Sequence, residues 1–173
     1  MKSMKQMAAA AMLAVLVCVA TMIIKIPSPM KGYLNLGDGV VLFSGWLLGP
    51  MYGFLAAGIG SALADFFSGY VVYVPATFII KGLMAAAACG LFRAMAGRFR
   101  VHTAMIASGL CAEIIMVLGY FVFEGFLYGF APSSVNIVAN GIQGLVGLVL
   151  GIFLMKMFKR VNGGLFIDSH LWR

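Results

Sequence analysis

The sequence predicts an all-α integral membrane protein: six transmembrane helices in a compact bundle, with both termini cytoplasmic. The 173 residues are 63% hydrophobic and 10% charged, with a mean hydropathy of +1.05, whereas soluble domains carry roughly 25% charged residues. Apolar stretches of about 20 residues, the length that crosses ~30 Å of hydrocarbon, recur along the chain. The short connections between them leave no room for a separate soluble domain.

Prolines and glycines set the expected helix boundaries. Pro27 ends the first helix because proline removes a backbone donor and clashes with the preceding turn. Gly49 and Pro50 form a tight turn between the second and third helices, and Pro75 occupies a first helical turn. The sequence predicts helices over residues 6–26, 36–48, 51–67, 75–96, 102–123 and 132–158, with a Gly- and aromatic-rich loop over 124–131. These form one membrane domain, residues 1–160, followed by a short cytoplasmic tail, residues 161–173.

The net charge of +7 comes from Lys and Arg residues at the ends of these helices. Grouped in this way, they indicate membrane orientation and not nucleic-acid binding. The opposite side carries Lys25 and Lys31 alone, so the positive-inside rule predicts a multi-pass membrane protein with both termini in the cytoplasm. The basic residues on the predicted cytoplasmic side are Lys2, Lys5, Arg93, Arg98, Arg100, Lys156, Lys159 and Arg160.

Polar residues inside the predicted helices cluster in the outer half of the membrane. Ionisable groups in a bilayer are costly, so Lys81 and Glu113 each need a partner, a water-filled cavity or a function. Asn136, Asn140 and Gln143 have the i, i+4, i+7 spacing that places all three on one helical face. This distribution predicts a pocket that opens outward.

A structural alternative remains open for each of these residues. Asp65 and Lys81 could form an ion pair, and the amides could hold helices together. Tyrosines near the outer loops are typical of an interfacial belt, although one or two could stack on a planar ligand. These tyrosines are Tyr33, Tyr70, Tyr73 and Tyr128.

Small residues mark one face of the first helix. Ala10 and Ala14 are four residues apart, and such a face lets another helix approach closely. Internal packing within the bundle is the alternative.

Signatures of catalysis, cofactor binding and metal binding are not found. The segment 58–60, Gly-Ile-Gly, lacks the third glycine of a dinucleotide fingerprint, and no Walker motif is present. The cysteines Cys18, Cys89 and Cys111 have no metal-site or disulfide spacing. We therefore expect a transport protein with no cofactor and no metal, and not an enzyme.

Five segments together resemble the substrate-binding S components of energy-coupling factor (ECF) vitamin transporters. They are Asn35–Gly39 (NLGDG), Leu48–Pro50 (LGP), Gly58–Asp65 (GIGSALAD), Ser68–Tyr70 (SGY) and Pro75–Gly82 (PATFIIKG).

The resemblance implies a multi-pass subunit of a prokaryotic cell membrane that binds a vitamin or precursor from outside and delivers it inward. Its partners would be a transmembrane scaffold subunit and two ATPase subunits, which would hydrolyse the ATP. In this family a small-residue surface on the first helix contacts the scaffold, which corresponds to Ala10 and Ala14. The resemblance also implies that a loop closes over the ligand and that the whole subunit topples in the membrane.

The substrate contacts expected from the polar residues and the resemblance come from helices and loops. Lys81, Glu113, Asn136 and Asn140 are expected from the helices, and Asn35 and Tyr73 from the loops. A pocket with both a lysine and a glutamate suits a compact heteroaromatic ligand. The vitamin B6 group or hydroxymethylpyrimidine, a thiamine precursor, therefore fits better than riboflavin.

Two other functions compete with this interpretation. A stand-alone secondary transporter or channel would explain the membrane acids, but it needs an inverted repeat or a continuous polar path, and neither is evident. A non-catalytic membrane subunit of a redox or assembly complex would predict histidine ligands in the membrane core. His102 and His170 both lie outside that core.

Overall fold

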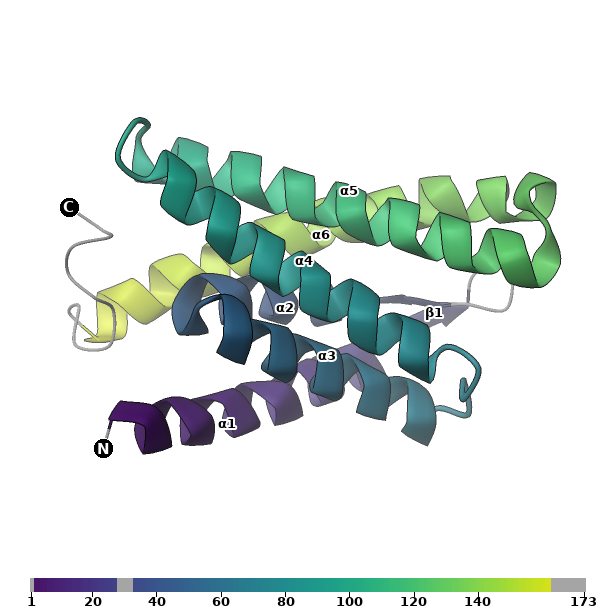
Figure 1. Ribbon diagram of the computed structural model, residues 1–173, viewed down its shortest axis with the longest axis horizontal. Coiled ribbons are helices and arrows are strands. Elements are labelled where there is room, and N and C mark those ends of the chain that lie inside the picture. The colour runs from purple at the N-terminus through teal and green to yellow at the C-terminus, as the bar shows by residue number, and fades with distance from the viewer. Residues whose placement is uncertain (1, 28–32, 163–173) are drawn as a thin grey trace.

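A computed structural model describes residues 2–27 and 33–162 of the chain, which form six helices and one two-stranded hairpin (Figure 1). Helix α2 lies at the centre of the bundle and packs against α1, α3, α4 and α6, while α5 packs against α4 and α6. The antiparallel strands pair Lys25 with Asn35. The elements are α1 (Lys2–Ile23), β1 (Lys25–Pro27), β2 (Tyr33–Asn35), α2 (Gly37–Leu48), α3 (Pro50–Phe67), α4 (Val74–Met95), α5 (Val101–Tyr128) and α6 (Phe130–Asn162).

The six expected helices are all present, but two connections differ from the prediction. The first helix ends at Ile23, and Lys25 and Ile26, which were expected to lie in it, belong to strand β1. The loop expected over 124–131 is wrong, because α5 continues to Tyr128 and turns at Gly129 into α6. Gly129 has φ 94°, a conformation that glycine adopts without a steric penalty. Most of the expected tail, residues 163–173, lies outside the described residues.

Four of the described helices are long and apolar enough to cross a membrane: α1, α4, α5 and α6. Helix α2 has 12 residues, which span about 18 Å at a rise of ~1.5 Å per residue. Ten of these residues are buried, so α2 is covered by the helices around it. The structure therefore supports a multi-pass membrane protein, while the number of six crossings stays a prediction.

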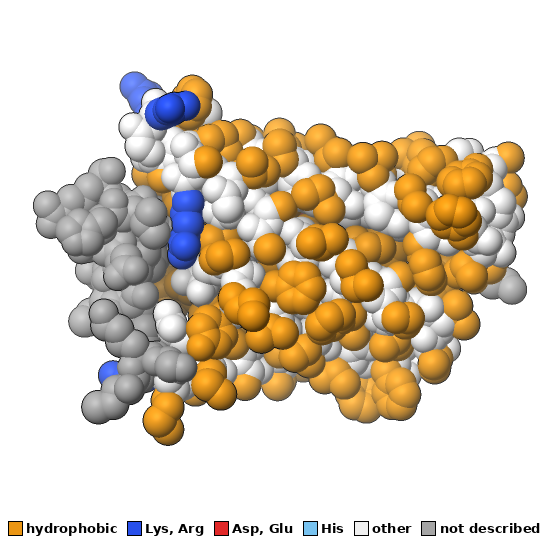
Figure 2. Space-filling view, in the orientation of Figure 1, with side chains coloured by type: hydrophobic (Ala, Val, Ile, Leu, Met, Phe, Trp, Pro, Cys, Tyr) orange, Lys and Arg blue, Asp and Glu red, His pale blue; other side chains and the backbone are white. Residues whose placement is uncertain are grey.

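The two ends of the bundle differ in charge. Helix α1 begins and α6 ends at one end, and the hairpin lies at the other (Figure 1). Figure 2 shows blue Lys and Arg side chains at the first end and hydrophobic side chains over the rest of this face. Arg93, Lys159 and Arg160 lie in the last turns of α4 and α6 at this end.

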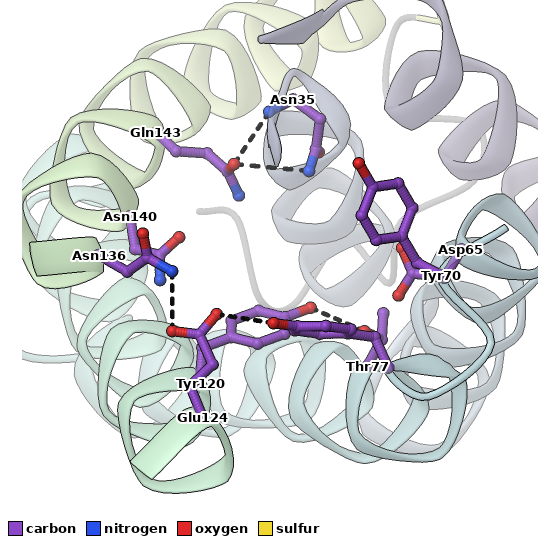
Figure 3. Close-up of a pocket in the computed structure, with 10 residues that line it drawn as sticks. Asn35, Asp65, Tyr70, Thr77, Tyr120, Glu124, Asn136, Asn140 and Gln143 are labelled. Atoms are coloured by element: carbon purple, nitrogen blue, oxygen red, sulfur yellow. Dashed lines mark hydrogen bonds between the residues drawn. The ribbon is translucent and has the colours of Figure 1, made fainter. Parts of the chain in front are cut away.

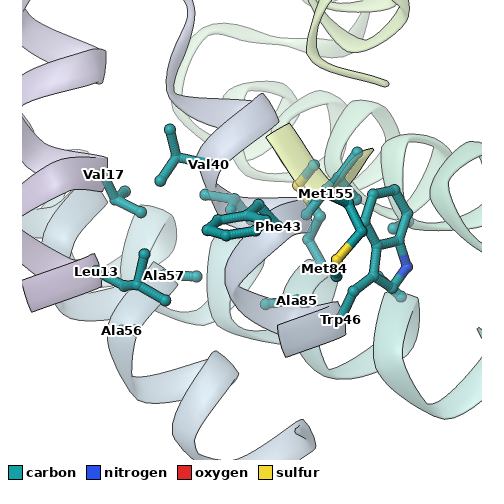
Figure 4. Close-up of a cluster of buried hydrophobic side chains, with 14 of the residues drawn as sticks. Leu13, Val17, Val40, Phe43, Trp46, Ala56, Ala57, Met84, Ala85 and Met155 are labelled. Atoms are coloured by element: carbon teal, nitrogen blue, oxygen red, sulfur yellow. The ribbon is translucent and has the colours of Figure 1, made fainter. Parts of the chain in front are cut away.

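An apolar core fills the middle of the bundle (Figure 4), and an apolar cavity of about 290 Å³ lies nearer the basic end between α1, α2 and α6. Met84, Met105 and Met155 are almost completely buried, and Trp46 is 4% exposed. The Trp46 indole N–H donates to Ser108 Oγ at 3.2 Å, which satisfies the only polar atom of this side chain.

Glycines allow the helices to approach closely at two central contacts. A methyl group added at Gly60 would collide with the carbonyl oxygen of Ala14, and one added at Gly45 would collide with the carbonyl oxygen of Ala85. Close approach at small residues is a usual source of packing energy between membrane helices. Gly60 thus fixes α3 against α1, and Gly45 fixes α2 against α4.

Ala10 and Ala14 lie on the face of α1 that packs inside the bundle. They are 8% and 9% exposed and belong to the apolar core. Ala8 and Ala11 on the same helix are exposed. The two alanines therefore serve internal packing in this structure, and a docking role for them stays a prediction that requires α1 to move.

Replacing Gly60 with alanine should destabilise the bundle. The added methyl group meets backbone, which cannot rotate away, so we expect a loss of about 1–3 kcal/mol. The matched control is Gly90→Ala, because a methyl group at Gly90 meets nothing within 4 Å. Thermal unfolding of both variants in detergent checks this; equal melting temperatures would contradict the close α1–α3 contact.

Candidate functional site

A polar pocket lies at the end of the bundle that carries the hairpin, away from the basic residues (Figure 3). Its cavity volume is about 40 Å³. Strand β2, helices α3, α4, α5 and α6, and the connection before α4 all contribute to its lining. The lining residues are Asn35, Asp65, Tyr70, Tyr73, Thr77, Tyr120, Glu124, Asn136, Asn140 and Gln143.

Glu124 lies on one wall of the pocket, fixed by two donors. Asn136 Nδ2 donates to Glu124 Oε2 at 2.9 Å, and the Tyr73 hydroxyl donates to Oε1 at 3.4 Å. Burial is the main reason that the pKa of the Tyr73 phenol is raised, so this hydroxyl keeps the proton that it donates. Glu124 is 3% exposed. These bonds hold α5, α6 and the start of α4 together around the carboxylate.

Tyrosines form a second wall. The hydroxyl groups of Thr77 and Tyr120 are 3.0 Å apart and hydrogen bonded. The rings of Tyr70 and Tyr73 meet edge to face with centroids 6.3 Å apart, an arrangement favoured by aromatic quadrupoles. The pocket thus combines flat apolar faces with a few placed polar groups, as is typical of sites for small molecules.

Gln143 connects the hairpin to the interior. Its Oε1 accepts a hydrogen bond of 2.9 Å from the backbone N–H of Asn35 in β2. Asn35 Oδ1 in turn accepts from the backbone N–H of Gly37, the first residue of α2, at 2.9 Å. The position of β2 is therefore coupled to α6 and to the start of α2.

A buried ion pair lies directly beneath this part of the pocket. Lys81 Nζ is paired with Asp38 Oδ1, and Gln143 Nε2 donates to Asp38 Oδ2 at 2.6 Å. Lys81 Nζ also lies 5.5 Å from the centre of the Tyr120 ring. The partner of Lys81 is Asp38 on α2, where the sequence had suggested Asp65 as the structural alternative.

Glu113 is also buried beneath the pocket, 6% exposed. Its carboxylate lies against α6, where a methyl group added at Gly144 or Gly147 would come within about 3 Å of its oxygens. Neither oxygen has a hydrogen-bond partner within the described part of the chain. An unpaired buried carboxylate is costly, which makes Glu113 unusual in this bundle.

The structure brings four of the six expected contact residues together. Asn35, Tyr73, Asn136 and Asn140 line the pocket. Lys81 and Glu113 are not among its lining residues and lie beneath it.

Two lining residues, Thr77 and Glu124, were not singled out from the sequence. Glu124 was placed in a loop because the fifth helix was ended at Phe123. The four-residue spacings from Thr77 to Lys81 and from Tyr120 to Glu124 are the signal that could have found them.

Within residues 2–27 and 33–162, no group of three or more His, Cys, Asp or Glu side chains is placed to hold a metal ion. The chemistry of the site is instead hydrogen bonding and aromatic contact. The fold and the pocket together define a helical membrane protein that can bind a small polar molecule at one end of its bundle.

Comparison with known proteins identifies the family. Residues 1–160 match the family model described as the ECF-type riboflavin transporter, S component, and the chain belongs to this family. A solved structure described as the S component of a bacterial ECF transporter shares the fold, with a TM-score of 0.70 and 24% identity, covering 91% of this chain and 97% of that one.

Two curated relatives match most of the chain. An uncharacterized protein in the gap 3' region of Pyrococcus woesei is 33% identical over 148 residues, which are 85% of this chain and 97% of that protein. The thiamine precursor transporter HmpT of Lactococcus lactis subsp. cremoris (strain MG1363) is 27% identical over 137 residues, which are 79% of this chain and 76% of that protein.

Removing the charge of Lys81 alone should destabilise the protein strongly. Lys81→Met leaves Asp38 buried without its counter-ion, which typically costs about 3–5 kcal/mol. The double variant Lys81→Met with Asp38→Asn removes both charges, so it should recover much of the stability. Unfolding in detergent measures both; a double variant no more stable than Lys81→Met would contradict the pairing.

Gln143→Leu should also destabilise the protein, because it leaves both Asp38 Oδ2 and the Asn35 N–H without their partner. A buried polar group left unsatisfied costs about 1–3 kcal/mol. Asn140→Leu is the matched control on the same helical face, since Asn140 is partly exposed. Comparison of melting temperatures tests the connection, and equal losses for the two variants would argue against it.

Proposed function

We propose that this protein is the substrate-specificity subunit of an ECF transporter, which binds a small water-soluble vitamin or precursor and delivers it inward. The observation that carries the proposal is the polar pocket at one end of the bundle, in a chain of the S-component family. The apolar core fills the middle of the bundle beneath it, which supports a pocket that opens at one end.

The pocket favours a small heteroaromatic ligand. Its cavity of about 40 Å³ is far below the roughly 300–1,000 Å³ of sites for drug-sized ligands, so even a single ring requires side chains to move. A single ring needs less widening than the three fused rings of riboflavin. Tyr70, Tyr73 and Tyr120 offer ring faces and edges for contact.

Hydroxymethylpyrimidine or a compound of the vitamin B6 group is the substrate we propose. The relative from Lactococcus lactis is described as a thiamine precursor transporter, which supports the pyrimidine. Riboflavin, for which the family model is described, is the competing ligand.

The direct contacts would come from residues that already line the pocket. Asn35, Asn136 and Asn140 supply amides, and Tyr73 supplies a hydroxyl and a ring. Lys81 and Glu113, which the sequence suggested as contacts, are not among the lining residues, so they would reach the ligand only if side chains of the lining moved aside. We propose that these two residues influence binding from beneath the pocket, without contacting the ligand directly.

The proposed orientation follows from charge. The basic residues gather at the end opposite the pocket, so the positive-inside rule places that end in the cytoplasm and the pocket on the outside of a prokaryotic cell membrane. Six crossings then put both termini in the cytoplasm.

Energy would come from partner subunits, because the sequence has no Walker motif. A transmembrane scaffold subunit and two ATPase subunits are the proposed partners, and the ligand-loaded subunit would topple in the membrane to release its ligand. Outside the basic end, the described surface of the bundle carries few charges. Moving this surface through the membrane therefore brings few charged groups into the hydrocarbon, which lowers the free-energy cost of toppling.

Uptake in proteoliposomes tests this function. The protein reconstituted with a scaffold and two ATPase subunits should accumulate radiolabelled hydroxymethylpyrimidine or pyridoxine only when ATP is supplied. The matched control uses ATPase subunits that bind ATP but cannot hydrolyse it, and it should show binding without accumulation. ATP-independent uptake by the protein alone would instead establish a secondary transporter or channel.

A further inference from the structure

Acidic side chains are concentrated at the pocket end of a protein whose net charge is +7. The chain has five Asp and Glu residues. Asp65 and Glu124 line the pocket, and Asp38 and Glu113 are buried beneath it. Two described bases lie at this end, and both are engaged: Lys81 is paired with Asp38, and Lys25 on β1 donates to Ser68 Oγ outside the pocket lining.

The pocket lining itself contains acids but no bases. None of the ten lining residues drawn from the described part of the chain is Lys, Arg or His. A phosphate or carboxylate group is usually bound by such cations or by several backbone N–H groups at a helix N-terminus. The lining therefore lacks the charged groups that would offset an anionic ligand.

Glu124 is held as an acceptor that faces this pocket. Asn136 and Tyr73 each donate one hydrogen bond to it, whereas a carboxylate offers about four acceptor positions. Figure 3 shows the carboxylate between the amide of Asn136 and the tyrosine rings. The positions that remain are suited to a donor on a ligand, such as an amine or a protonated ring nitrogen.

We propose that this pocket binds a neutral or cationic heteroaromatic ring that carries an amine and rejects the phosphate ester of the same ring. Glu124 sets this preference. The inference rests on the function proposed above and narrows its substrate class. The amine donates to Glu124, and the tyrosines contact the ring. A phosphate would bring acceptor oxygens and negative charge towards Glu124 and Asp65.

Paired ligands test the proposal on the purified full-length protein in detergent. Hydroxymethylpyrimidine is compared with its monophosphate, and pyridoxamine with its phosphate, by isothermal titration calorimetry, with riboflavin as a further ligand. The phosphate would bring its negative charge close to the acidic side chains of a desolvated site, which makes the binding free energy less favourable. We therefore expect the phosphate esters to bind at least about 100-fold more weakly than the parent rings. An ester that binds as tightly as its parent would overturn the proposal.

Two variants at one position assign the preference to Glu124. Glu124→Gln keeps the size of the side chain but removes its charge, so it should weaken binding of the parent ring at least about 10-fold and narrow the gap to its phosphate ester. Glu124→Asp is the matched control, because it keeps the charge and should keep the preference. An unchanged preference in Glu124→Gln would show that Glu124 does not set it.

The outcomes separate this inference from the proposed function. Binding of riboflavin alone would keep an S component but overturn the substrate class. Binding of none of the five compounds would count against both. The comparison of each ring with its own ester uses the unmodified protein, so it decides the inference even if Glu124→Gln fails to fold.

Discussion

The ion pair between Asp38 and Lys81 is the interaction on which the polar end of the bundle depends. Taking two charges out of water is costly, and a buried pair persists only where further hydrogen bonds satisfy the remaining atoms. The side-chain amide of Gln143 makes both connections: its Nε2 donates to Asp38, and its Oε1 accepts from the backbone N–H of Asn35. A single set of contacts thus holds α2, α4, α6 and strand β2 in register beneath the pocket.

The pocket adds a second set of contacts above this one. Glu124, Asn136 and Tyr73 connect α5, α6 and the start of α4. Since each polar group holds another in place, the wall presents its amides and carboxylate in fixed directions before any ligand arrives. Such preorganisation lowers the entropy lost on binding. The small volume of the cavity means that lining side chains have to move before a ring can enter.

The sequence predicts the helices well because their apolar stretches are long and their ends carry proline or glycine. It also predicts that Asn136, Asn140 and Gln143 share a face, since this follows from helical spacing alone. It does not predict that Lys81 pairs with Asp38, 43 residues away, because helix-to-helix pairing depends on which faces meet. Glu124 was missed for a local reason: Gly125 and Gly129 suggested a loop, yet tertiary packing keeps the last turn of α5 helical.

The methionine- and tryptophan-filled core beneath the polar cluster has a consequence for the cell. Trp46, Met84, Met105 and Met155 occupy the centre of the bundle, and such packing leaves no continuous wetted route from the pocket to the basic end through these residues. For the transport function proposed above, idle copies of this subunit would then not dissipate proton or sodium gradients. In that function, the same packing would require a captured molecule to leave by the mouth through which it entered.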